Sequence, residues 1–216
     1  MRELVWAVIG VLFGLRAVLQ AQRDVNRLRA TGETFGAGGS TAFSFIIPFV
    51  ACASAALWWM AATRFDEDLT VLCFGVLISV GLRLMLIDLD THLLPSGIVY
   101  RAIAVALPLL TLATLADDTG SITTMLLGAV IMWFLMKTLE VLSRGDLGGG
   151  DVRLALLLGL YTGWLSLEHV AVAVVTACAV AGLFALGLVV LRRAGRRTHI
   201  AFGPFLIAGA LFAVLR

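Results

Sequence analysis

The sequence predicts an all-α fold, in the form of a polytopic integral membrane protein with about eight transmembrane helices. Hydrophobic residues make up 61% of the 216-residue chain and charged residues only 14%, whereas about a quarter of the residues in an ordinary soluble domain are charged. The mean hydropathy is +1.02. Apolar segments of roughly the 20 residues that span a bilayer alternate with short polar breaks. These observations exclude an ordinary soluble domain.

Four apolar segments in the first half of the chain are expected as membrane helices. They cover residues 4–20, 42–62, 69–87 and 98–116. Pro48 lies inside the second segment and predicts a kink there. The stretch from 20 to 39 carries arginines and four glycines without apolar periodicity, so we expect an exposed linker. A polar break, 88–97, separates the third and fourth segments.

Four more apolar segments follow in the second half of the chain. They are expected as helices over 122–142, 152–167, 170–191 and 200–215. A glycine-rich break that ends in Asp151 separates the first two of these, and a loop with four arginines joins the last two. Glycines and clustered charges of this kind usually interrupt a helix and mark a loop.

Arginine counts in the loops predict the orientation in the membrane, because cytoplasmic loops carry an excess of basic residues. Nine arginines fall in the 20–42 linker, the glycine-motif loop and the 192–199 loop, whereas the opposite side has Arg2, Arg64 and Arg216. The acidic clusters at 66–68 and 117–118 fall on the arginine-poor side. The N-terminus is therefore expected outside, with the regions of Asp88 and Asp151 facing the cytoplasm together.

Asp88 and Asp151 are the candidate catalytic residues. Asp88 ends the third apolar segment, and Asp151 opens the sixth directly after Gly148, Gly149 and Gly150. Ionisable residues this close to hydrocarbon are costly and indicate a functional site. Two neighbouring carboxyl groups can share a proton, so that one activates a water molecule while the other polarises a carbonyl. The alternative for Asp151 is a helix N-cap after a glycine loop that breaks the helix.

Other polar residues give no competing site. Asp90, two positions after Asp88 and so on another helix face, is expected as a solvated loop acid or turn former, with a secondary catalytic role as the alternative. The single, scattered cysteines are expected as small core residues without metal-ligand spacing; they are Cys52, Cys73 and Cys178. The isolated histidines His92, His169 and His199 are not expected to act as ligands. The sequence contains no GxSxG or HExxH motif, and no cleaved signal peptide is expected.

At these acids the chain resembles the type IV prepilin peptidases. The segment 87–95, Ile-Asp-Leu-Asp-Thr-His-Leu-Leu-Pro, resembles their first catalytic motif, in which a helix-ending aspartate precedes a Leu-Pro pair. The segment 148–154, Gly-Gly-Gly-Asp-Val-Arg-Leu, resembles their second motif, GxGD followed by a basic residue. Similarity continues at 158–164 and 202–205.

The resemblance implies a GxGD-type membrane aspartic endopeptidase. Such an enzyme removes the basic leader of type IV prepilins and pseudopilins at the cytoplasmic face of the bacterial inner membrane. Asp88 and Asp151 would be catalytic, and Gly148, Gly150, Pro95 and Arg153 would support the motifs. No cofactor, metal or nucleic acid is implied, and the oligomeric state stays open. Residues 69–216 would form the catalytic domain, preceded by N-terminal helices and a basic linker in 1–68.

Several positions depart from the family pattern. Ser96 stands where Asp or Asn is common, Arg153 replaces a commoner Lys, and Ala201 replaces a common proline. These three departures bear on the substrate preference. Bifunctional members carry a cytoplasmic domain with paired cysteines that is linked to N-methylation of the product. Only the cysteine-free stretch 20–42 occupies that place here. We therefore expect a short form that cleaves but does not methylate.

Two other functions remain alternatives. A presenilin-like intramembrane protease would have Tyr before its first catalytic aspartate, where this chain has Ile87. A proton-coupled transporter could use Asp88 and Asp151 as a relay, but it should show an internal repeat, and 88–97 does not resemble 148–154. A purely structural membrane subunit is the third possibility.

Overall fold

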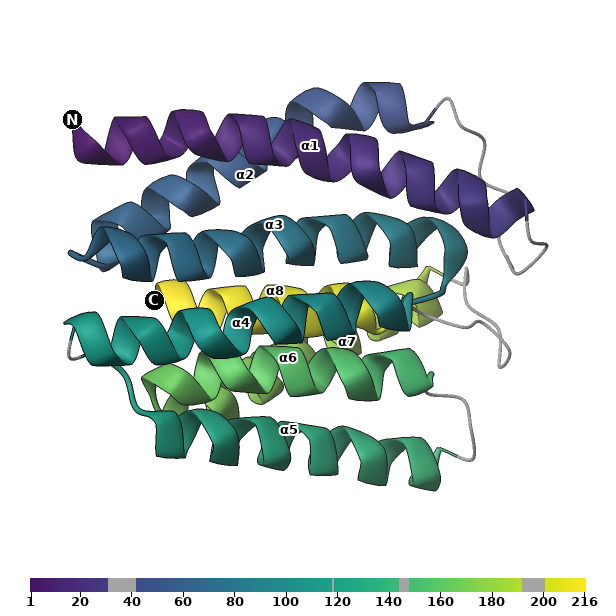
Figure 1. The fold of residues 1–216 in the computed structure, drawn as a ribbon. Coiled ribbons are helices and arrows are strands. Elements are labelled where there is room, and N and C mark those ends of the chain that lie inside the picture. Colours follow the sequence, from purple (N-terminus) through teal and green to yellow (C-terminus); the bar gives the residue numbers. More distant parts are fainter. Residues whose placement is uncertain (31–41, 118, 144–147, 192–200) are drawn as a thin grey trace. The chain divides into compact units, whose positions relative to one another are not determined.

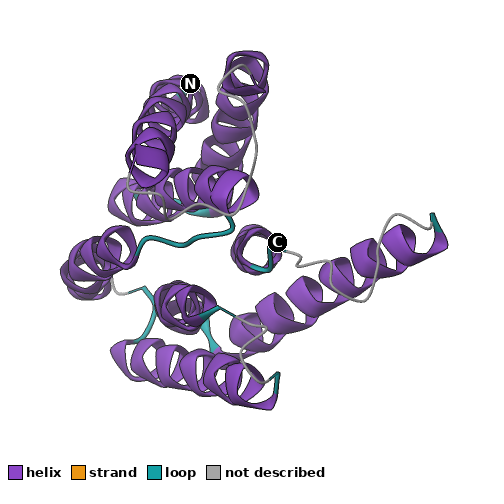
Figure 2. Ribbon diagram, turned by 90° about the vertical axis from the view of Figure 1, so that its right-hand side faces the viewer, coloured by secondary structure: helices purple, strands orange, loops and turns teal. Residues whose placement is uncertain are grey.

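The computed structural model describes residues 1–30, 42–117, 119–143, 148–191 and 201–216. Across these ranges the chain is helical and has no strand (Figures 1 and 2). The helices, in order, are α1 (Arg2–Ala30), α2 (Ala42–Arg64), α3 (Asp68–Thr91), α4 (Ser96–Asp117), α5 (Ile122–Leu142), α6 (Gly149–Leu165), α7 (Leu167–Val190) and α8 (Gly203–Leu215).

The helix lengths confirm the all-α, polytopic membrane class. Among the described residues, α1 to α5 and α7 are long and apolar enough to cross a membrane. The other two helices are shorter, with 17 residues in α6 and 13 in α8. The chain divides into two compact units. Unit 1 is Met1–Thr119 with Leu215, and unit 2 is Gly120–Val214 with Arg216.

In unit 1, α1 packs against both α2 and α3. The Arg2 guanidinium donates hydrogen bonds to the backbone carbonyls of Ala62, Phe65 and Asp66, at the turn between α2 and α3. These bonds satisfy carbonyl groups that a helix end leaves without an intrahelical partner. The Trp6 indole donates to the Asp68 carboxylate over 3.0 Å. The first turns of α1 and α3 therefore lie together, and the two helices run parallel (Figure 1).

In unit 2, α5 and α6 pack closely through glycines. A Cβ placed on Gly159 would lie 2.6 Å from the Gly128 carbonyl oxygen, and one on Gly163 would lie 2.8 Å from the Gly128 Cα. Small residues four apart allow helix backbones to approach in this way, which is a common packing mode in membranes. Trp164 covers Gly120, which has a φ of 70°. The Trp164 carbonyl accepts the Ser121 backbone N–H over 3.0 Å.

The ends of the first and third helices differ from the sequence prediction. The expected linker is wrong over 20–30, because α1 continues to Ala30 and buries Ala21 and Val25. Polar side chains in this part of α1 pair with α3, as described below, which lets a polar sequence remain helical. Residues 31–41 of the expected linker lie outside the described residues. The third segment was expected to end at residue 87, but α3 continues through Thr91.

The expected burial of the cysteines is wrong for two of the three. Cys73 is buried in α3, whereas Cys52 on α2 and Cys178 on α7 are exposed. Both helices have exposed large apolar residues, and such faces contact lipid in a membrane protein. Cysteine behaves as a small hydrophobic residue, so it is tolerated on a lipid-facing surface as well as in the core.

Candidate active site

Asp88 lies in the last turn of α3 and is buried, with 4% of its surface exposed. The helix ends shortly after it. The backbone N–H of His92 donates to the backbone carbonyl of Asp88 over 2.9 Å, and the Thr91 hydroxyl donates to the Ile87 carbonyl over 2.8 Å. Asp88 is thus held in the last turn of α3, close to the C-terminus of the helix.

His92 forms the left-handed cap of α3. Its φ is 52° and its ψ is 29°, and it is the one described non-glycine residue with positive φ. Histidine enters this region more readily than most non-glycine residues. Pro95 follows in the loop and directly precedes α4. Its ring disfavours helical backbone at Leu94. The Leu-Pro pair of the first motif therefore separates the Asp88 helix from the next one.

Asp151 lies in the first turn of α6 and is also buried, with 8% of its surface exposed. The N-cap is Gly148, with a φ of −71° and a ψ of 140°. Asp151 is therefore not the N-cap, and Gly149 and Gly150 begin the helix instead of breaking it. The Asp151 backbone N–H donates to the Gly148 carbonyl over 3.0 Å. First-turn carboxylates are stabilised by the unpaired N–H groups of the helix start.

The glycine motif is flanked by charged side chains. A Cβ placed on Gly149 would lie 3.3 Å from the Glu140 Oε1 atom and 3.9 Å from an Arg153 guanidinium nitrogen. Glu140, on α5, also pairs with Lys137 over 2.5 Å. A Cβ placed on Gly148 would lie 3.9 Å from the Asp151 Oδ2 atom. The second motif therefore places both acidic and basic groups around the start of α6.

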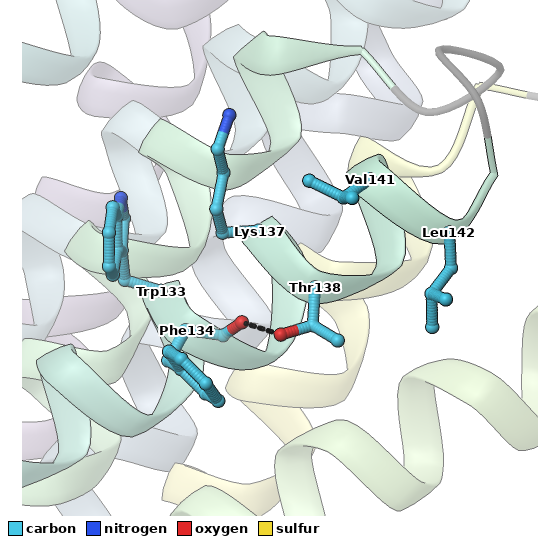
Figure 3. Close-up of a pocket in the computed structure, with 6 residues that line it drawn as sticks. All are labelled: Trp133, Phe134, Lys137, Thr138, Val141 and Leu142. Carbon is cyan, nitrogen blue, oxygen red and sulfur yellow. Dashed lines mark hydrogen bonds between the residues drawn. The ribbon is translucent and has the colours of Figure 1, made fainter.

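A groove of about 340 Å³ lies along the C-terminal half of α5, between Trp133 and Leu142 (Figure 3). Its lining is apolar apart from Lys137 and Thr138, and the Thr138 hydroxyl donates to the Phe134 carbonyl within the helix. Neither candidate acid lines it. An apolar outer face is what a helix in contact with lipid requires, so this groove is not part of the candidate active site.

The expectation of a solvated loop is wrong for Asp90. This residue is in α3, and only 13% of its side chain is exposed. The Arg29 guanidinium donates to both of its carboxylate oxygens, over 3.0 and 2.7 Å. Arg29 falls in the stretch that was expected as an exposed linker, so this pair was not predicted. The same holds for Asp24, which accepts two hydrogen bonds from Arg83 of α3.

The histidines and possible metal ligands add little to the site. His169 lies 2.7 Å from the Ser166 hydroxyl through its Nδ1 atom, near the start of α7. His199 and the four arginines of the last basic loop lie outside the described residues. Within the described ranges, the structure brings together no group of three or more His, Cys, Asp or Glu side chains that could hold a metal ion.

Comparison with known proteins identifies the family. The model of the type IV leader peptidase family matches residues 75–192, more than half of the chain. The chain belongs to the type IV leader peptidase family. Both Asp88 and Asp151 fall inside the matched region of this family member. None of the solved structures matches it.

Curated relatives of this family member carry the name prepilin leader peptidase/N-methyltransferase. The Bacillus subtilis protein is 27% identical over 80% of this chain and 66% of its own length. The Aeromonas salmonicida protein is 28% identical over 82% and 60%, and the Burkholderia pseudomallei protein is 31% identical over 75% and 52%. The chain therefore spans between half and two thirds of the length of these relatives.

Proposed function

We propose that the chain is an aspartic endopeptidase that removes the basic leader of type IV prepilins or pseudopilins at the cytoplasmic face of the inner membrane. One observation carries the proposal: the family match at 75–192 contains two buried carboxyl groups, each at a helix end. Curated relatives named for prepilin leader peptidase activity support the substrate class. The catalytic part would be 69–216.

Asp88 and Asp151 act as a pair in this mechanism. One carboxylate takes a proton from water, and the resulting hydroxide attacks the carbonyl carbon of the scissile peptide bond. The other, protonated acid donates a hydrogen bond to the carbonyl oxygen and stabilises the negative charge that develops there. Collapse of the tetrahedral intermediate breaks the C–N bond, and the leaving amine takes up the proton that the base removed from water. Two acids that share one proton supply both groups, a charged carboxylate that acts as the base and a protonated carboxyl group that donates the hydrogen bond.

The kinds of helix end at which the two acids lie support a division of the two roles. The start of α6 presents unpaired backbone N–H groups to Asp151, which favours its charged form. Asp88 lies at the end of α3, beside backbone carbonyls, which favours the protonated form of its carboxyl group. We therefore infer that Asp151 is the general base and Asp88 the general acid. Gly148, Gly150, Pro95 and Arg153 support the two motifs that hold these acids.

The substrate is expected to bind at the membrane interface. A prepilin combines an apolar helix, which belongs in the bilayer, with a basic leader, which belongs in water. The bond between them must therefore be cut close to the membrane surface. The arginine distribution favours a cytoplasmic location for the ends of the third and sixth segments. Glycines at the second motif leave room for an extended peptide to approach the backbone.

Purified protein in lipid vesicles, incubated with a prepilin fragment that includes the leader and the apolar helix, tests the function. We expect one cut at the C-terminal end of the leader, identified by the masses of the two products. A matched fragment without the leader should stay intact. An uncut prepilin would contradict the function, and cuts inside the apolar helix would favour a presenilin-like protease instead.

The relatives' second activity, N-methylation, is not proposed for this chain. Its three cysteines lie singly within apolar helices, whereas a small zinc-supported domain needs several cysteines close together. The mature pilin N-terminus is expected to have an unmodified mass when this chain is the only enzyme present. A gain of one methyl group that depends on S-adenosylmethionine would contradict this expectation.

A further inference from the structure

The C-terminal third of α1 is joined to α3 by two ion pairs in a part of the chain where charges are costly. Arg83 donates to Asp24 over 2.9 and 2.6 Å and to the Gln20 side chain over 2.9 Å. Arg29 donates to both carboxylate oxygens of Asp90. All four charged side chains are mostly buried, with exposed fractions between 13% and 26%. Charged residues within membrane helices are rare and usually functional.

The two pairs share one face of α3. Arg83 and Asp90 are seven residues apart, which places them within about 20° of each other around a helix with 3.6 residues per turn. Asp88 is two residues before Asp90 and five after Arg83, so around the helix it points about 160° away from Asp90 and about 140° away from Arg83. We call the face that carries Arg83 and Asp90 the back of α3. α1 binds the back of α3, and Asp88 is directed away from α1.

The charge order fixes how α1 sits on α3. Along the parallel helices, α1 presents an acid at Asp24 and then a base at Arg29, while α3 presents a base at Arg83 and then an acid at Asp90. A shift of one helical turn between them would separate both pairs and would leave charges buried without partners, which is strongly unfavourable. The arrangement thus selects one register and one rotation of α3 about its axis.

We propose that the polar end of α1 is a positioning element for the Asp88 carboxyl group, and that Asp90 and Arg29 are its central residues. The proposal rests on the proposed function, in which Asp88 is a catalytic acid. Rotation of α3 swings the Asp88 side chain about the helix axis, and a displacement of about 1 Å in a catalytic group can reduce the rate a hundredfold. Asp90 therefore acts through Arg29 and the orientation of α3, without contact with the substrate.

The first test compares the cleavage kinetics of Arg29→Gln, Asp90→Asn and the double variant. We expect kcat to fall by about tenfold to a hundredfold with little change in KM. Because both single variants break the same pair, the double variant should be no slower than either one. The charge-reversed variant, Arg29→Asp with Asp90→Arg, should recover much of the activity. Asp68→Asn is the matched control, since Asp68 contacts α1 at the opposite end of α3.

The second test does not require cleavage. Asp88→Cys, in a chain whose Cys52, Cys73 and Cys178 are replaced by serine, reports the orientation of α3 through its rate of reaction with a maleimide. Loss of the Arg29–Asp90 pair should raise that rate several-fold, and charge reversal should lower it again. The double neutral variant leaves no charge of this pair buried without its partner, so it should fold like the parent. If its protein amount equals that of the parent, a higher maleimide rate reports a change in the orientation of α3 and not misfolding.

The outcomes distinguish this inference from the proposed function. If the parent protein does not cleave a prepilin, the proposed function fails, and the maleimide rates still decide whether the pair orients α3. If the parent cleaves and the Arg29 and Asp90 variants keep both its kcat and the maleimide rate of Asp88→Cys, the positioning role is wrong. The positioning role would also be wrong if the activity losses of the Arg29 and Asp90 single variants added up in the double variant.

Discussion

At the scale of single residues, the two candidate acids occupy opposite kinds of helix end. Asp88 is near the C-terminus of α3 and Asp151 is in the first turn of α6. The partial charges of the backbone groups around them differ in sign, because a helix start presents N–H groups and a helix end presents carbonyl groups. Identical side chains can therefore take different protonation states, which an acid–base mechanism requires.

This difference predicts which acid carries the shared proton. Infrared spectra should show that the protonated carboxyl band is lost in Asp88→Asn and kept in Asp151→Asn. The physical reason is the stabilisation of charged Asp151 by the N–H groups of α6. A protonated band that disappears in Asp151→Asn and persists in Asp88→Asn would reverse the assignment.

His92 gives a second prediction at the residue scale. Its left-handed backbone is unfavourable for a residue with a Cβ, whereas glycine adopts it readily. His92→Gly should therefore leave the end of α3 intact and stabilise the folded protein by up to about 1 kcal/mol. Thermal unfolding of the purified protein would measure the change. A clear loss of stability would mean that the imidazole makes a contact worth more than the backbone strain.

The place of each site residue and of its partner along the chain explains which site residues the sequence could predict. Asp88 and Asp151 were identified because acids at the ends of apolar segments are unusual and match two motifs. Asp90 was misassigned because its partner, Arg29, is 61 residues away in sequence, and pairing between distant charges has no local signal. The arginine itself looked like part of a linker, because residues that pair in three dimensions break the apolar periodicity of their own helix.

At the scale of helices, close packing of α5 on α6 supports the helix that carries Asp151. Gly128, Gly159 and Gly163 let the two backbones meet. Apolar length predicted both helices, but it could not identify which faces touch, because a helix that is apolar all round has no distinct core side. The role of these glycines was consequently not predicted, although the four-residue spacing of Gly159 and Gly163 is a usable signal.

Substitution at this contact should destabilise unit 2. A Cβ on Gly163 would lie 2.6 Å from the Thr124 carbonyl oxygen, so Gly163→Ala must force the helices apart. We expect a loss of about 1–3 kcal/mol, measured by thermal unfolding in detergent. Gly182→Ala on α7 is the matched control, because its Cβ would meet no atom within 4 Å. Equal stability of the two variants would contradict the packing.

At the scale of the whole molecule, the described helices are arranged in two compact units, one ending near Thr119 and the other beginning at Gly120. Composition and apolar length predicted the class and the succession of helices, because hydrocarbon requires long apolar helices whatever their detailed packing. The boundary between units was not predicted, since the residues near Thr119 read only as another polar loop.

The predicted orientation can be tested on intact cells. In a cysteine-free chain, Glu67→Cys should react with a maleimide that cannot cross the membrane, and Gly97→Cys should react only after the membrane is opened. Both positions are exposed, and the arginine distribution assigns them to opposite sides. Labelling of Gly97→Cys in intact cells, with Glu67→Cys protected, would reverse the orientation and move the proposed site to the outer face.

Asp88 and Asp151 are proposed to work as one catalytic pair, and the rates of prepilin cleavage by variants of these two residues test this claim. Initial rates should be measured at equal protein amounts for Asp88→Asn, Asp151→Asn, the double variant and the exposed control Asp66→Asn. We expect each single variant to lose at least about a hundredfold. The double variant should be no slower than the singles, because the residues act as a unit, and the control should match the parent. Cleavage near the parental rate by either Asp88→Asn or Asp151→Asn would contradict the claim.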